Sequence, residues 1–213
     1  MIVLSAIVLW LLATFPAFAE EYVDDGPEVL VQDSSVSQWY PEAKGAKLEI
    51  FIEGEILLGS AAKLSAGLAV ADSSQPLVTV HLASPGGRLA EALKMAVSLE
   101  KMKGQGRTVR TYVTEYSMCM SACMLLFMVG NERRVDTTSQ LGFHQARSLA
   151  NSGGATTEEE DALNSLISDL LVRQGVRKTV ADAWRNTPPD QMFIVDGFDA
   201  IENGIATHEY YTE

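Results

Sequence analysis

The sequence has little positive charge. Its 16 Lys and Arg stand against 28 Asp and Glu, which gives a formal net charge of -12 over 213 residues. No run of basic residues offsets this balance. Because nucleic acids and anionic membrane surfaces attract proteins through basic patches, the composition argues against both as partners.

Cysteine and histidine are also scarce. The chain has two cysteines, Cys119 and Cys123, and three histidines. Two thiols without a nearby histidine cannot form a structural zinc site, so we expect no metal and no cofactor. The two cysteines are spaced so that a disulfide is feasible, but two small buried apolar residues would fit equally well. Both interpretations stay open at the level of the sequence.

Charged side chains are absent from residues 1–19, which end in Ala17 and Ala19 before Glu20. A short apolar run that ends in such small residues is typical of a cleavable secretory signal. We therefore expect cleavage after Ala19 and a periplasmic or secreted protein. The segment also lacks the usual Lys or Arg near its start, so an uncleaved membrane anchor is the alternative. Contact with a membrane is expected only in that case.

Two further regions follow the signal. Residues 20–46 are acidic, rich in serine and interrupted by Pro27 and Pro41, which predicts an extended arm or linker. Residues 47–213 read as one domain. Their pattern predicts strands at 47–56, 76–83, 107–114, near Arg134, at 139–146 and within 187–206, and helices at 58–72, 88–104, 122–130, 157–175, 177–186 and before 206. This alternation predicts an α/β fold with a largely parallel sheet surrounded by helices.

Three residues that could act together each lie at the end of a predicted element: Ser121, His144 and Asp190. Loops at the carboxyl ends of parallel strands collect in one place, so these side chains could converge. A serine hydroxyl becomes a nucleophile when an imidazole takes its proton and a carboxylate orients that imidazole. On local evidence alone, Ser121 reads better as the N-cap of the following apolar helix.

The sequence also suggests a source of oxyanion stabilisation. The turn "SPGG", formed by Ser84, Pro85, Gly86 and Gly87, offers amides that no Cβ obstructs. The helix after Ser121 would aim the Ala122 amide toward the same point. The simpler interpretation is an ordinary turn beside an ordinary helix start.

These motifs together resemble the Clp protease proteolytic subunit family of the Clp/crotonase superfamily. The shared pattern is "SPGG" after a strand, serine in "MSAC", histidine in "GFHQA", aspartate in "PPDQMF" and the closing "DAIENGIA". The similarity covers about residues 47–206. The chain is especially similar to the exported Clp-like branch, in which cysteines flank the serine. It differs at Ala146, where the family has proline.

The resemblance implies a crotonase-like core of repeated β-β-α and β-α units and a serine peptidase. Ser121, His144 and Asp190 would be the catalytic residues, and the Gly87 and Ala122 amides would form the oxyanion hole. Peptides or unfolded proteins would be the substrates, and the subunit could assemble into a homo-oligomer. An exported enzyme meets no ATP, so we expect it to work without an ATPase partner.

Three other functions fit parts of the pattern. The chain could keep the fold as a binding or scaffolding protein without turnover. A Ser/Lys peptidase would need a lysine at Ser121, and the candidate in the later half, Lys178, reads as a solvated helix residue. An acyl-CoA reaction would need a basic cluster for the nucleotide phosphates, which this acidic chain lacks.

Overall fold

The computed structural model describes residues 28–34, 47–70, 75–147 and 157–209. The predicted signal and most of the predicted arm lie outside these residues. Within the described part, no helix is long and apolar enough to cross a membrane.

The larger of two sheets has six strands in the order β1-β2-β3-β4-β6-β9. Its strands are Glu28–Ser34, Lys47–Glu53, Leu77–Ala83, Thr108–Val113, Glu132–Val135 and His208–Glu209. All neighbours pair in parallel except β1 and β2, which are antiparallel. The prediction of a largely parallel sheet is therefore confirmed, and part of the predicted arm forms the edge strand β1.

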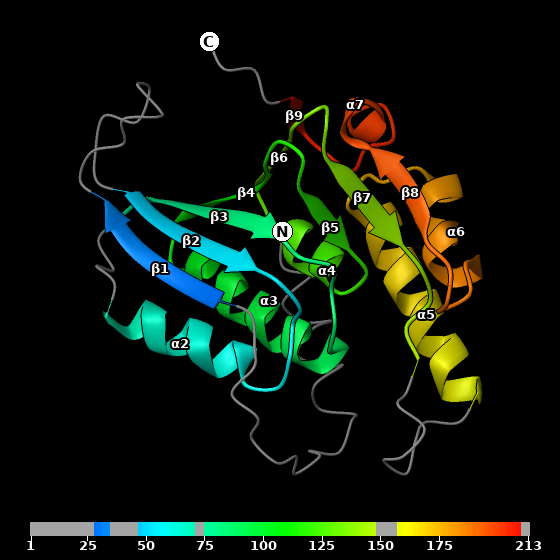
Figure 1. Ribbon diagram of the computed structural model, residues 1–213, viewed down its shortest axis with the longest axis horizontal. Helices are drawn as coiled ribbons and strands as arrows, with labels where there is room; N and C mark the ends of the chain where they lie inside the picture. Colours follow the sequence, from blue (N-terminus) through cyan, green and yellow to red (C-terminus); the bar gives the residue numbers. More distant parts are fainter. Residues whose placement is uncertain (1–27, 35–46, 71–74, 148–156, 210–213) are drawn as a thin grey trace.

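The helices follow the predicted order. They are α2 Ser60–Val70, α3 Leu89–Gly104, α4 Cys123–Phe127, α5 Thr157–Arg173, α6 Lys178–Asn186 and α7 Gly197–Ala200. Figure 1 shows α2 and α3 along one side of the six-stranded sheet and the α5–α6 pair beyond the second sheet.

The second sheet has three short strands in the order β5-β7-β8. They are Met118–Met120, Gln140–Phe143 and Phe193–Asp196. β5 and β7 run parallel, while β8 is antiparallel to β7. β5 was not predicted, because three residues are too few to show an alternation of apolar and polar side chains.

One apolar core joins these elements. β3 is buried along its five central residues, as expected for a strand that is covered on both faces. α4 is buried along its whole length. Because α4 begins two residues after Ser121, the core fixes the position of the turn at Ser121 (the serine turn).

A buried arginine ties the end of the chain to this core. Arg133 on β6 is 6% exposed. Its guanidinium donates hydrogen bonds to the carbonyl oxygens of Ile205 (2.7 Å), Gln174 (3.1 Å) and Gly204 (3.3 Å). Burial lowers the pKa of Arg133. The bonds join β6 to the α5–α6 turn and to the segment after α7.

We predict that Arg133→Met lowers the free energy of unfolding by about 2 to 4 kcal/mol, because one buried and two partly buried carbonyl groups lose a charged donor. Arg134→Met is the matched control on the same strand. Its guanidinium contacts Glu132 at 3.3 Å in a partly exposed ion pair, so we expect a loss below about 1 kcal/mol. Urea unfolding of both variants measures the difference, and equal losses would contradict the assigned role.

Candidate active site

Ser121 occupies a strained turn between β5 and α4. Its backbone φ is 53°, in the left-handed region that residues with a side chain seldom adopt. Its amide donates to the carbonyl oxygen of Gly142 at 2.9 Å. The half-buried serine therefore continues the pairing of β5 with β7 and then turns sharply into the helix.

The interpretation of Ser121 as an N-cap is wrong. α4 begins at Cys123, Ala122 precedes it as the N-cap, and no side chain caps the helix. An N-cap residue normally has an extended backbone, which aims its side chain at the amides of the first turn. The left-handed backbone of Ser121 does not provide that geometry, so its hydroxyl is not used to start the helix.

A disulfide closes the serine turn. Cys119 and Cys123 are bonded, with Cα atoms 5.3 Å apart. Both side chains are fully buried. The sequence left a bridge and two free buried thiols as alternatives, and the structure has the bridge. It joins the middle of β5 to the first residue of α4, with Ser121 between them.

The "SPGG" turn is attached to the same strand. Ser84, at the end of β3, donates from its amide to Met118 at 2.8 Å, and its carbonyl accepts from the Met120 amide at 3.0 Å. Its hydroxyl accepts a hydrogen bond from the Gly86 amide at 3.1 Å. The buried Ser84 therefore holds the glycines beside the serine turn, while Pro85 is exposed.

Gly86 packs directly against the serine turn. Its φ is +93°, and a Cβ at this position would lie 2.5 Å from the Met120 carbonyl oxygen and 2.8 Å from Cβ of Ser121. The Ala122 amide nitrogen would be 3.0 Å away. Two parts of the predicted site that lie far apart in the sequence are therefore in contact.

Two amides near this contact are free to bind an oxyanion. Ile56 bonds to the carbonyl of Gly86 and the amide of Arg88, so the intervening Gly87 amide points away from Ile56. Among the described residues, neither the Gly87 amide nor the Ala122 amide donates a hydrogen bond. Their availability fits the predicted role, which stays a prediction.

His144 follows β7 directly. Met120 is paired with Gly142, so Ser121 stands beside Phe143, and His144 lies one position further along at the same edge of the small sheet. Nδ1 of His144 is buried and has no hydrogen-bond partner. Burial lowers the pKa of His144. A hydrogen bond with the Gln145 backbone raises this pKa, and the positive charge of Arg147 lowers it further, so the net shift is downward. The imidazole is therefore favoured in its neutral form.

Asp190 lies in the loop that enters β8 at this edge. Phe193 is paired with Phe143, so the loop before Phe193 passes the end of β7. Asp190 is exposed. In the described part of the chain, no hydrogen bond joins Asp190 to His144 or His144 to Ser121. The three candidate residues share one edge, and the contacts of a closed triad are not formed.

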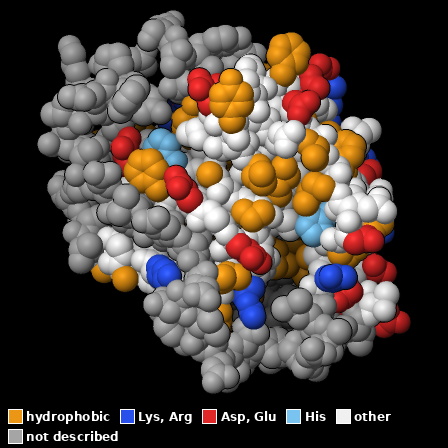
Figure 2. All heavy atoms as spheres, in the orientation of Figure 1, with side chains coloured by type: hydrophobic (Ala, Val, Ile, Leu, Met, Phe, Trp, Pro, Cys, Tyr) orange, Lys and Arg blue, Asp and Glu red, His pale blue; other side chains and the backbone are white. Residues whose placement is uncertain are grey.

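An apolar surface borders this edge. The pairing Met118–Gln140–Asp196 and Met120–Gly142–Ile194 puts these residues on one face of the small sheet. Met118, Ile194 and the adjacent Met192 are 43%, 46% and 37% exposed. Figure 2 shows hydrophobic side chains gathered near the middle of the face that carries this sheet.

The other basic candidates are engaged elsewhere. Lys178 is exposed and contacts Asp182 at 2.6 Å, which agrees with its reading as a solvated helix residue. His81 lies in β3 and stacks on Phe51. His208 is exposed and bonds to the Thr207 hydroxyl.

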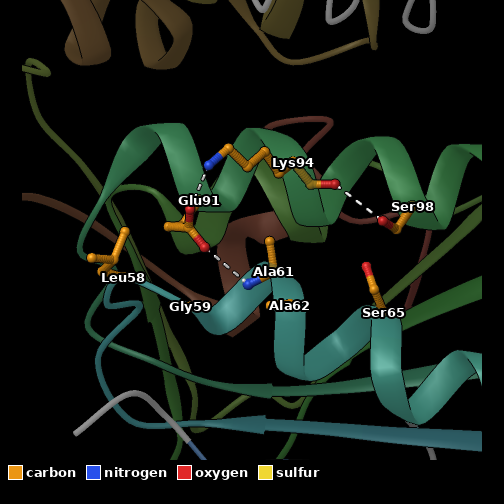
Figure 3. A pocket seen from close by; sticks show the side chains of 8 residues that line it. All are labelled: Leu58, Gly59, Ala61, Ala62, Ser65, Glu91, Lys94 and Ser98. Atoms are coloured by element: carbon orange, nitrogen blue, oxygen red, sulfur yellow. Dashed lines mark hydrogen bonds and ion pairs between the residues drawn. The ribbon is translucent and has the colours of Figure 1, made fainter. Parts of the chain in front are cut away.

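A cavity of about 420 Å³ lies away from this edge, between α2 and α3. Figure 3 shows that Glu91 reaches across it to the Ala61 amide at 3.0 Å while it also contacts Lys94 at 2.7 Å. The buried carboxylate thus caps the start of α2 and joins the two helices. None of the predicted site residues lines the cavity, whose walls are Leu58, Gly59, Ala61, Ala62, Ser65, Glu91, Lys94 and Ser98.

Comparison with solved structures gives this geometry a context: the chain has the fold of Clp-type serine proteases. It is similar to a serine-to-alanine mutant of the 1510-N membrane-bound stomatin-specific protease, with a TM-score of 0.59 and 15% identity over 75% of this chain and 77% of that one. It is also similar to a mutant of ClpP1 from Listeria monocytogenes, with a TM-score of 0.58 and 17% identity over 77% and 91% of the two chains. No family model and no curated protein sequence matches.

Sequence reasoning missed one residue near the site. Asn164 is buried on α5 and bonds to the backbone of Ala146, two residues after His144. The sequence did contain a signal that could have identified Asn164. Asn164 occupies the buried stripe of α5 together with Ile167, Ser168 and Leu171, and a polar amide in such a stripe needs partners.

We predict that Gly86→Ala reduces the free energy of unfolding by more than about 2 kcal/mol, because its Cβ would overlap a backbone carbonyl that cannot move freely. Gly106→Ala is the matched control. Its φ is +85°, and a Cβ there meets nothing within 4 Å, so only backbone strain of about 1 kcal/mol is expected. Urea unfolding compares the two variants; a loss at Gly86 no larger than at Gly106 would contradict the contact.

Proposed function

We propose that the protein is a serine peptidase that hydrolyses peptide bonds through Ser121, His144 and Asp190. The observation that carries the proposal is the strained turn at Ser121, packed against Gly86 at the edge that also bears His144. Strain of this kind is concentrated at active sites, where it presents a reactive group. The likeness to Clp-type protease structures supports the same reaction class.

The proposed reaction assigns one role to each group. The Ser121 hydroxyl attacks the amide carbonyl, while His144 takes its proton and then delivers it to the leaving amine. Asp190 orients His144, and the Gly87 and Ala122 amides stabilise the oxyanion. Catalytic hydrogen bonds are often long or unformed without substrate. Closure of Asp190 onto the unpartnered Nδ1 of His144 is therefore part of the proposal.

The substrate we propose is a peptide or an unfolded protein. The apolar surface formed by Met118, Met192 and Ile194 borders the site, and unfolded chains carry the apolar side chains that such a surface accepts. We further propose that the protein is exported through residues 1–19, works without an ATPase and can form homo-oligomers.

A second candidate is a Clp-fold binding or scaffolding protein without turnover. One observation favours it: Asp190 is exposed and makes no bond to His144 among the described residues. A site that stayed in this arrangement would leave the imidazole without its orienting carboxylate.

We predict that a fluorophosphonate probe adds once to the mature chain beginning at Glu20, and that Ser121→Ala abolishes the adduct. Intact-mass measurement on oxidised and reduced protein detects it. His144→Ala should slow labelling by about a hundredfold or more, because the serine loses its general base. Lys178→Ala should leave the rate unchanged.

Ser117→Ala serves as a control for labelling of a serine outside the site. Absence of an adduct in both redox states would exclude the serine hydrolase and favour the binding protein. Persistent labelling of His144→Ala together with a loss in Lys178→Ala would instead indicate a Ser/Lys dyad.

The pH dependence provides another test. His144 acts as a base only when neutral, and its pKa is lowered from the ordinary 6.5 by burial. The neutral form therefore persists to lower pH. As the pH is lowered, the labelling rate should fall with a midpoint below pH 6.5. A midpoint above 6.5 would mean that a carboxylate already holds the imidazole in the free enzyme and stabilises its charged form.

A further inference from the structure

Asn164 makes a closed set of hydrogen bonds next to the site. Its Oδ1 accepts from the Ala146 amide at 2.8 Å and from Nε1 of Trp184 at 3.1 Å. Its Nδ2 donates to the carbonyl oxygens of Ala146 at 3.0 Å and Glu160 at 2.9 Å. An amide has two acceptor positions and two donors, so every one is used.

The two bonds to Ala146 restrain the peptide that follows His144. The Asn164 side chain contacts both the amide and the carbonyl of one residue, as a neighbouring strand would. The Asn164 side chain is only 3% exposed, so these bonds are costly to break. Ala146 is thereby fixed to α5, although this segment has left β7 and belongs to no strand.

The adjacent residue is fixed to α6. The Gln145 amide donates to the Thr187 carbonyl at 2.9 Å, and its Nε2 donates to the Arg185 carbonyl at 2.5 Å. Trp184, which bonds to Asn164, lies on the same helix. The segment after His144 is therefore held between α5 and the end of α6, and Asp190 follows in the loop after α6.

On the proposed function, we infer that Asn164 is a positioning residue for His144: by restraining Ala146 against α5, it sets where the imidazole stands relative to Ser121. In the described structure, Nδ1 of the imidazole has no hydrogen-bond partner that would orient the ring. The ring position consequently depends on the backbone that carries it. A displacement of about 1 Å in such a group can reduce turnover about a hundredfold.

We predict that Asn164→Ala lowers kcat for peptide hydrolysis by about tenfold to a hundredfold with little change in KM, because the base is displaced while the apolar substrate surface is untouched. This kcat is calculated per active site, and the number of active sites is the number of serines that fluorophosphonate labels. A purely structural residue would reduce the number of labelled sites and leave kcat per site unchanged.

Three further variants sharpen the test. Ser165→Ala is the control on the same helix, since the Ser165 hydroxyl donates to the Asp161 carbonyl at 2.7 Å on the exposed side, and it should match the wild type. Trp184→Phe removes one bond to Asn164 and leaves both bonds to Ala146, so it should lose stability with kcat per site within about threefold. Asn164→Asp keeps the two acceptor bonds but turns an oxygen toward the carbonyl oxygens of Ala146 and Glu160, so it should be less stable than the wild type and lose kcat per site in the same direction.

The chemical shifts of the His144 ring, followed by NMR, provide a readout that does not need activity. They should move in Asn164→Ala and stay in place in Trp184→Phe. Unchanged kcat per site and an unmoved ring would overturn the inference. A wild type that cannot be labelled, combined with a ring that moves, would overturn the proposed function and leave the positioning role supported; an unmoved ring in that case would overturn both.

Discussion

The close contact of Gly86 with the turn at Ser121 constrains the arrangement of the whole site. A side chain at Gly86 would overlap the Met120 carbonyl, and Ser84 holds the glycine there through bonds to β5. This contact goes with a left-handed backbone at Ser121. The disulfide between Cys119 and Cys123 closes the same turn from the core side. The strain is maintained because strand pairing, bridge and glycine contact act on the same few residues.

The remaining groups reach this turn through the register of the small sheet. β7 brings Phe143 level with Ser121 and His144 one position further, and the antiparallel strand β8 brings the loop of Asp190 back to that edge. Strand pairing positions backbones well, but it does not orient an imidazole. Nδ1 of His144 lacks a partner, and burial keeps the ring neutral. In the proposed mechanism, His144 is thus already in the protonation state that a base needs before Asp190 reaches it.

The sequence predicted much of this because the ends of elements are set by local patterns. Ser121, His144 and Asp190 were found at such ends, and the order of the long helices and central strands follows from their apolar periodicity. The left-handed backbone of Ser121 could not be predicted, since it depends on contact with Gly86, 35 positions away. The N-cap interpretation failed for this reason. β5 and the antiparallel pairing of β8 depend on partners that a short segment does not specify.

The two sides of the site are supported by different parts of the molecule. Ser121 and the glycines are anchored to β3, β5 and the core around α4, whereas the segment after His144 is anchored to α5 and α6 through Asn164 and Gln145. Relative movement of the α5–α6 pair would displace His144 and Asp190 together and leave Ser121 in place. Arg133, which bonds to the turn between these helices and to the chain after α7, limits that movement. The placement of His144 and Asp190 relative to Ser121 is therefore a property of how the helical pair packs on the small sheet, which a local motif cannot encode.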